Sequence, residues 1–319
     1  MIFLAKHYLF CSHFLTYLTA HTLEPIMTKN TMWPVPFLRI GTAIAFSPTA
    51  EANLSESSRI ASGFGAQLIL IHVGEESQEN TDKIHGLVEK VGFPIANIEI
   101  SFQSGDPVNA ILKGCQEKEV DLLIAGALQK ENLMQYYKGS VARKLCRKAN
   151  CSLLLLTNPQ ITSRLCEKIV VNGLDHPKTE DTIKTAFYAA SKLGAKQLFI
   201  LEEMDQKLVK TKNQDDLSLV KAQRSRKNIE REEKRRMDKI LSEIPPIDDL
   251  EVQEKFIFGR KGYSIGHFAQ TKKMDLLVLN SPDTKLGFLD RVFTHDLEYI
   301  LSDMPSDILI VHSSKTLAN

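Results

Sequence analysis

The chain has 319 residues, and at roughly 100 to 200 residues per domain this length predicts two domains. Hydrophobic residues make up 43% and charged residues 25%, which is typical of globular proteins and excludes a disordered, collagen-like or coiled-coil chain. The net charge is +1, so the composition as a whole predicts neither a nucleic-acid partner nor a membrane surface. Any such partner needs a local patch.

The N-terminal segment and the cysteines bear on location. Residues 1–26 include an apolar run from Tyr8 to Ala20 that is loosely like a signal peptide, but polar residues interrupt it and it is too short to span a bilayer. We interpret residues 1–37 as an extension outside the fold; a weak export signal is the alternative. The five cysteines form no CxxC motif, which favours a reducing, cytoplasmic location over a disulfide framework or a zinc site.

From Ile40 onward, short apolar runs alternate with periodic segments of helical length, a pattern typical of βαβ units with a parallel sheet. The first five strands are expected at residues 40–46, 67–73, 98–102, 121–125 and 153–156. The helices between them are expected at residues 51–64 and 81–91, after Pro107 and from Ser140. We place a first domain at 38–158, followed by a polar linker at 159–166.

The order then restarts in a second domain, which we place at 167–314. It contains expected strands at 168–171, 196–201, 275–279 and 306–311 and a helix at 180–193. The strand that begins at Asp275 mirrors the one that begins at Asp121, so the chain is a tandem duplication at the length of whole domains. The second copy carries about 25 extra residues, because the first strands are 129 positions apart (Ile40 and Ile169) and the fourth strands 154 (Asp121 and Asp275).

These extra residues fall in a charge-dense insert at about 203–243, after the second strand of the second copy. Charges of both signs at three- and four-residue spacing predict a solvated helix with a narrow apolar edge. A helix that docks a partner protein is the alternative.

The residues best suited to a ligand follow the fourth strand of the first domain. Gly126-Ala127-Leu128-Gln129 comes directly after that strand, and nine residues later Gly139-Ser140-Val141 begins a helix. Gly126 lets a backbone approach a ligand closely, while Gly139-Ser140 offers a hydroxyl and the free amides of a helix N-terminus, which suit phosphate. Ligands of open α/β sheets bind at the carboxyl ends of strands. Ordinary turn and cap chemistry is the alternative interpretation of these residues.

Three further segments are distinctive: Ile44-Ala45-Phe46-Ser47-Pro48 at the end of the first strand, His72-Val73 and Gly105-Asp106-Pro107. With the glycine motif, they resemble the universal stress proteins of the UspA family over residues 38 to 313. ATP-binding members of that family share Gly, two residues, Gly, nine residues, then Gly and Ser or Thr. Gln129 replaces the second glycine here, and Ala45 replaces an aspartate that helps to hold the nucleotide.

This resemblance implies two tandem Rossmann-like α/β domains (adenine nucleotide alpha hydrolase-like), each a five-stranded parallel sheet flanked by helices. It implies a non-catalytic stress-response protein that binds ATP or another adenine nucleotide, with magnesium, in its first domain. The implied site residues are Ala45, Phe46, Val73, Gly126, Ala127, Gln129, Gly139, Ser140 and Val141. Three nearby cations, Lys130, Lys138 and Arg143, offer compensation for the lost aspartate.

In the second copy the motif positions hold Asn280, Asp283, Phe293 and Thr294, and Leu174 replaces the aspartate, so ATP is not expected there. The resemblance implies that two domains pair through their last strands, residues 153–156 and 308–311, within one chain or in a homodimer. The principal alternative function is an interaction module that has lost nucleotide binding in both domains and engages an unidentified protein. A slow ATPase is a third. We expect no nucleic-acid partner, no membrane and no bound metal other than the nucleotide's magnesium.

Overall fold

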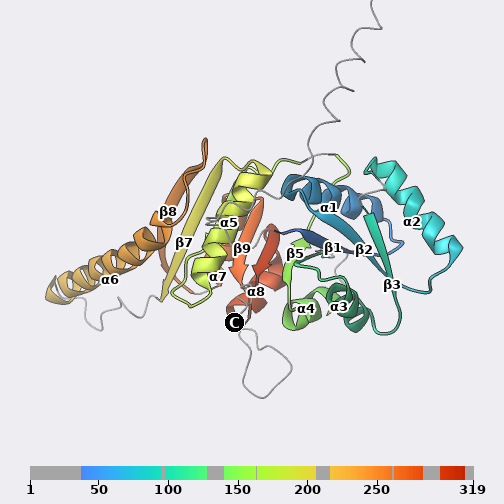
Figure 1. The fold of residues 1–319 in the computed structure, drawn as a ribbon. Helices are drawn as coiled ribbons and strands as arrows, with labels where there is room; N and C mark the ends of the chain where they lie inside the picture. Colours follow the sequence, from blue (N-terminus) through green and yellow to red (C-terminus); the bar gives the residue numbers. More distant parts are fainter. Residues whose placement is uncertain are drawn as a thin grey trace, which may run out of the picture. The chain divides into compact units, whose positions relative to one another are not determined.

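The computed structural model describes residues 37–94, 98–127, 140–162, 164–205, 216–260, 262–282 and 295–312. The described part of the first half contains five strands and four helices, which Figure 1 labels: β1 Arg39–Ile44, α1 Ala50–Phe64, β2 Gln67–Val73, α2 Gln78–Val91, β3 Ile98–Gln103, α3 Pro107–Glu117, β4 Leu122–Gly126, α4 Ser140–Lys148 and β5 Ser152–Leu156. The described part of the second half contains β6 Lys168–Asn172, α5 Thr179–Leu193, β7 Gln197–Asp205, α6 Asp216–Ser242, β8 Glu251–Gly259, α7 Tyr263–Thr271, β9 Leu276–Asn280, α8 His295–Asp303 and β10 Asp307–Val311.

All ten strands form one sheet in the order β3-β2-β1-β4-β5-β10-β9-β6-β7-β8. Within each half the strands are parallel, and the two halves share the same order of strands. The halves meet where β5 and β10 pair antiparallel, with Leu309 opposite Leu154. The expected α/β fold is confirmed, and so is the expected pairing of the last strands, which occurs within one chain. The two five-stranded sheets are continuous with each other.

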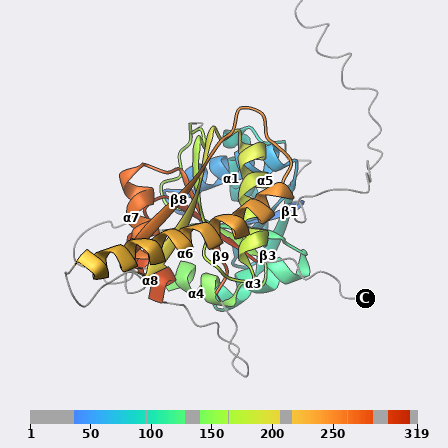
Figure 2. The same cartoon turned by 90° about the vertical axis from the view of Figure 1, so that its left-hand side faces the viewer.

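Helices cover both faces of the sheet, which explains why the inner strands β4, β5, β9 and β10 are apolar at nearly every position. The core on one face includes residues of α1, α2, α5 and the end of α6, such as Leu54, Ile183 and Met237. The core on the other face includes residues of α3, α4, α7 and α8, such as Ile111 and Leu145. Figure 2 shows the molecule from the side of β8, with α6 nearest the viewer.

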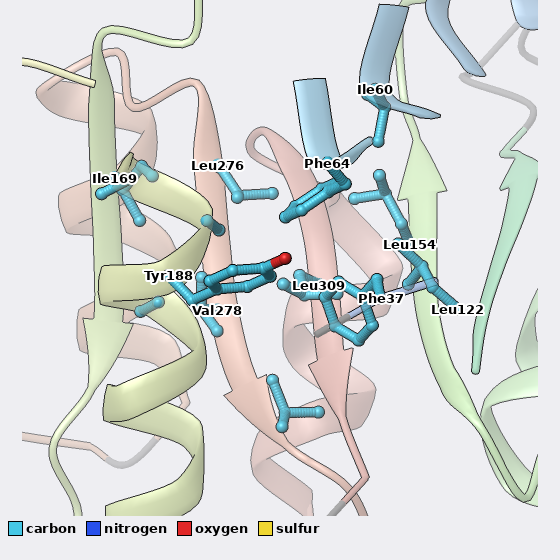
Figure 3. Packing of buried hydrophobic residues seen from close by; sticks show 14 of the residues in the cluster. Phe37, Ile60, Phe64, Leu122, Leu154, Ile169, Tyr188, Leu276, Val278 and Leu309 are labelled. Atoms are coloured by element: carbon cyan, nitrogen blue, oxygen red, sulfur yellow. The ribbon is translucent and has the colours of Figure 1, made fainter. Parts of the chain in front are cut away.

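An aromatic cluster joins the two halves on the first of these faces (Figure 3). Phe64, the last residue of α1, lies 5.4 Å from Tyr188 of α5 between ring centroids. Phe37 lies 5.3 Å from Phe64 and 6.3 Å from Tyr188, and only 6% of its surface is exposed. The packed chain therefore includes Phe37, which the sequence analysis placed in the extension. Residues 1–36 lie outside the described residues.

The charged insert begins later than expected from the sequence. Residues 202–205 continue β7, and the insert's helix is α6, which ends at Ser242. The sequence analysis did not identify β8, α7 or α8. Most positions of β8 are charged or only half-buried, because it is the outermost strand of the sheet, so it lacks the apolar run that marked the other strands.

Candidate functional site

The ends of three parallel strands meet at the candidate site of the first half. β1 lies between β2 and β4, with Ile44 opposite His72 and Thr42 opposite Ile124. The expected site residues therefore lie at one edge of the sheet: Ala45 and Phe46 after β1, Val73 at the end of β2, Gly126 at the end of β4 and Ala127 directly after it. This is the edge at which open α/β sheets bind their ligands.

The rest of the expected site is only partly within the described residues. Ser140 is the first residue of α4, and Val141, which follows it, is 39% exposed. Gln129 and Gly139 lie outside the described residues, as do Lys130 and Lys138. Arg143 lies on α4 and is half-buried.

Asn53 of α1 lies directly against Gly126. A methyl group built on Gly126 would lie 2.7 Å from Asn53 Oδ1, so the site accommodates the amide only because residue 126 is glycine. Asn53 Nδ2 donates to Thr49 Oγ1 at 3.3 Å, whereas Asn53 Oδ1 is buried and has no hydrogen-bond partner among the described residues. A buried acceptor without a partner is costly, so Asn53 Oδ1 is a candidate contact for a ligand's donor. The sequence analysis missed Asn53, which no motif marks.

An aromatic surface forms the other side of this edge. The Phe46 ring is 43% exposed and its centroid lies 4.7 Å from that of the buried His72 ring, whose Nδ1 is 3.2 Å from the carbonyl oxygen of Ile44. Lys83 Nζ lies 5.4 Å from the centroid of the Phe46 ring. A flat, partly exposed ring beside a cation suits an aromatic base bearing phosphates.

The equivalent edge of the second half is occupied by the protein's own side chains. By strand register, Asn280 takes the place of Gly126, and Glu202 takes the place of His72. Asn280 Nδ2 donates to Thr179 Oγ1 at 3.0 Å, so residue 280 itself supplies an amide, whereas in the first half the amide of Asn53 packs against Gly126. Asn280 Oδ1, like Asn53 Oδ1, is buried and has no hydrogen-bond partner among the described residues. Leu174 follows β6 as expected, whereas Asp283, Phe293 and Thr294 lie outside the described residues.

Arg236 of α6 closes this second edge. Its guanidinium donates to the carbonyl oxygen of Gly173, at the end of β6, to Glu202 Oε2 at 3.1 Å and to Glu233 Oε2 at 2.8 Å. The insert thus places a cation among the strand ends and neutralises part of a buried acidic group. Glu203, next along β7, accepts from the backbone N–H groups of Gly262 and Ile265 and so fixes the beginning of α7.

Glu202 predicts a measurable pH dependence. Burial, assisted by a hydrogen bond with Glu233, raises the pKa of Glu202 from its usual 4.5 to about 8, against the opposing effect of Arg236. The folded state therefore holds a proton that the unfolded state loses above about pH 4.5, so stability falls as the pH rises from about 5 to 8 and levels off above that. The contribution is at most about 1.4 kcal/mol per pH unit.

We expect Glu202→Gln to remove this part of the pH dependence, because glutamine mimics the protonated acid. Urea unfolding at pH 5, 7 and 9 measures it, with Glu251→Gln on the exposed edge of β8 as control. Equal loss of stability in wild type and Glu202→Gln between pH 5 and 8 would contradict the assignment.

Within the described ranges, no group of three or more His, Cys, Asp and Glu side chains is arranged to hold a metal ion. None of the described helices is both long and apolar enough to cross a membrane.

These features define a Rossmann-like α/β protein with two corresponding strand edges, the second of which is occupied by Asn280 and Arg236. Residues 74–157 match the model of the Universal stress protein family. Universal stress protein MJ0531 of Methanocaldococcus jannaschii is 30% identical over 94 residues, which are 30% of this chain. Universal stress protein YxiE of Bacillus subtilis is 24% identical over 146 residues, which are 38% of this chain and 99% of that protein.

The chain spans about half the length of the first of these relatives, 54%. A crystal structure from Pseudomonas aeruginosa UCBPP-PA14, assigned to the universal stress proteins, has 17% sequence identity and a TM-score of 0.60 and covers 88% of this chain and 95% of its own. This likeness shows that the fold extends over both halves. The match to the family model lies within the first half, where the motifs also lie.

Proposed function

We propose that the first half binds ATP or another adenine nucleotide at the edge formed by β1, β2 and β4, and that the chain is a non-catalytic stress-response protein of the universal stress protein type. The observation that carries this proposal is the unpartnered Asn53 Oδ1 beside Gly126. A base amino group or a ribose hydroxyl is a donor of the right kind for it.

The other residues of the site have complementary roles. The exposed part of the Phe46 ring and Val73 offer an apolar surface for the base, while Ala45 leaves the polar contact with the ribose to Asn53. The amides at the beginning of α4, with Ser140 and Arg143, are the proposed phosphate contacts, together with Gln129 and Gly139. Magnesium, if bound, is held by the nucleotide's phosphates in this proposal.

The second half is proposed to bind no nucleotide, because Asn280 and Arg236 occupy its strand ends.

We propose domains at 38–158, extended to include Phe37, and at 167–314, joined by the linker 159–166. The scarcity of cysteines supports a cytoplasmic location. From the family resemblance we also propose a homodimer, and an unidentified protein is a further proposed partner. If neither half binds a nucleotide, the chain is an interaction module, and its exposed helix α6 favours this second candidate.

The test is calorimetric titration with ATP, ADP and AMP, with and without magnesium. We expect saturable binding to the wild type and a loss of about fivefold to tenfold in affinity for Asn53→Leu, which removes the acceptor and keeps the bulk. Gly126→Ala should have a similar effect, because its methyl group displaces the Asn53 amide.

Gly86→Ala is the matched control for Gly126→Ala. Gly86 lies within α2, and a methyl group there meets nothing within 4 Å, so binding should be unchanged. Absence of binding by the wild type at millimolar nucleotide would overturn the proposal. Equal binding by wild type and Asn53→Leu would move the site away from Gly126.

A further inference from the structure

Helix α6 is held to the rest of the protein mainly by its last turns. Met237 and Ile240 are buried, with 0% and 7% exposure. Between Leu217 and Arg235, by contrast, none of the described side chains is buried. In Figure 1 the beginning of α6 lies beyond the edge strand β8, and Figure 2 shows the helix along the side of the molecule. Most of this 27-residue helix is therefore accessible.

One face of α6 carries a row of five cations, which we call the basic row: Lys221, Arg224, Lys227, Arg231 and Arg235. Steps of three and four residues place them on the same side of a helix. All five are exposed, and none forms an ion pair with another residue in the described parts of the chain. At 1.5 Å per residue the row is about 21 Å long.

Three other cations of the helix contact neighbouring side chains, whereas Lys239, one turn after Arg235, is exposed like the row. Arg226 lies over the Phe258 ring at 4.4 Å and pairs with Glu230, Lys234 pairs with Glu254 of β8, and Arg236 pairs with Glu202. These residues attach α6 to the sheet. The basic row faces away from those contacts, so attachment of the helix leaves its charges uncompensated.

The composition of this face indicates the class of partner. Protein interfaces have apolar centres from which charged residues are depleted, yet no apolar residue lies among the cations between Arg224 and Arg235 on this face. Leu217 and Val220 are exposed, but only at the first turn. A membrane-surface helix needs a continuous apolar face, and the apolar edge of α6 is buried against the sheet at Met237 and Ile240. A row of charge alone matches a phosphate backbone.

We propose that the basic row binds the phosphate backbone of double-stranded DNA without sequence preference. An α-helix about 10–12 Å across fits the major groove of B-DNA, about 12 Å wide, whereas the corresponding groove of duplex RNA is too narrow. Three of the five cations are arginines, whose guanidinium groups match phosphate oxygens. The expectation of no nucleic-acid partner came from the net charge of the whole chain, which conceals this local patch. The proposal is independent of nucleotide binding.

The test is fluorescence anisotropy with two 20-base-pair DNA duplexes of unrelated sequence at several salt concentrations. Five phosphate contacts predict a slope of about −4.5 in a plot of log affinity against log salt, since each contact contributes about −0.9. The triple variant Arg224→Gln, Lys227→Gln, Arg231→Gln should bind at least about tenfold more weakly at low salt, with a slope closer to −2.

Two control variants keep the result interpretable. Lys90→Gln, Lys113→Gln, Lys196→Gln makes the same change in net charge away from α6 and should bind as the wild type does. Arg224→Lys, Arg231→Lys keeps the charges of the row and should retain most of the affinity. Circular dichroism checks that each variant keeps its helix content.

Equal affinity of the triple variant and the wild type would overturn the proposal, as would absence of binding to either duplex at low salt. Tighter binding to polyglutamate than to DNA would overturn it in favour of an acidic protein partner. Tighter binding to vesicles of anionic lipid would overturn it in favour of a membrane surface.

Discussion

Replacing Phe64 by alanine is expected to lower the free energy of unfolding by about 4 kcal/mol, the usual cost of removing a buried phenylalanine. The ring is 6% exposed and lies between Phe37 and Tyr188, at the contact of α1 with α5 (Figure 3). Its removal leaves a cavity at the boundary of the two halves, where two elements far apart in sequence must move together to fill it.

Urea unfolding followed by circular dichroism measures this effect. Phe64→Leu is the matched control and should lose much less, because leucine keeps most of the volume. A chain that begins at residue 38 lacks Phe37 and should be less stable than one that begins at residue 37. If Phe64→Ala cost no more than Phe64→Leu, the cluster would contribute little to the packing of the halves.

Asp307→Ala is the second large effect, with an expected loss of about 3 kcal/mol. Asp307 begins β10, and its carboxylate accepts hydrogen bonds from the backbone N–H of Thr157 at 2.8 Å and its hydroxyl at 2.9 Å. It also pairs with Arg164 of the linker. Burial raises the pKa of Asp307, against these stabilising contacts. Alanine leaves the buried Thr157 amide and the arginine without their acceptor, at the antiparallel joint of the two halves.

The size of the loss in the free energy of unfolding shows whether Asp307 stabilises only its own contacts or the pairing of β5 with β10. Asp307→Asn keeps one acceptor oxygen for Thr157 and should cost less than alanine. Asp303→Ala, an exposed acid at the end of α8, is the control and should be near neutral. A near-neutral Asp307→Ala would show that strand pairing alone holds the joint.

Most strands could be predicted because their physical signal is local. β4 and β9 are buried on both faces and so appear as continuous apolar runs after an aspartate, which is why their likeness also revealed the duplication. β8 gave no such signal, since it lies at the edge of the sheet and carries charged residues such as Glu251, Glu254 and Lys255. The continuation of β7 to Asp205, and so the late beginning of the insert, could not be predicted, because Glu202 and Glu203 are charged and yet buried.

The candidate site was predictable only where residues are contiguous. Gly126 and Phe46 could be placed at the strand ends from motif and topology. Asn53 could not, because its importance comes from contact with Gly126 across 73 positions of sequence and from an acceptor left without a partner. The role of Arg236 could not be predicted for the same reason, since nothing in the sequence of a charged helix indicates which cation contacts the strand ends.

The antiparallel pairing of β5 with β10 has a consequence for how ligands can coexist on this chain. It points the strands of the two halves in opposite directions, so the carboxyl ends of β1, β2 and β4 open at one rim of the sheet and those of β6, β7 and β9 at the opposite rim. Arg236 and the last turns of α6 occupy that second rim. The nucleotide proposed at Gly126 and the DNA proposed on α6 would therefore not compete for space.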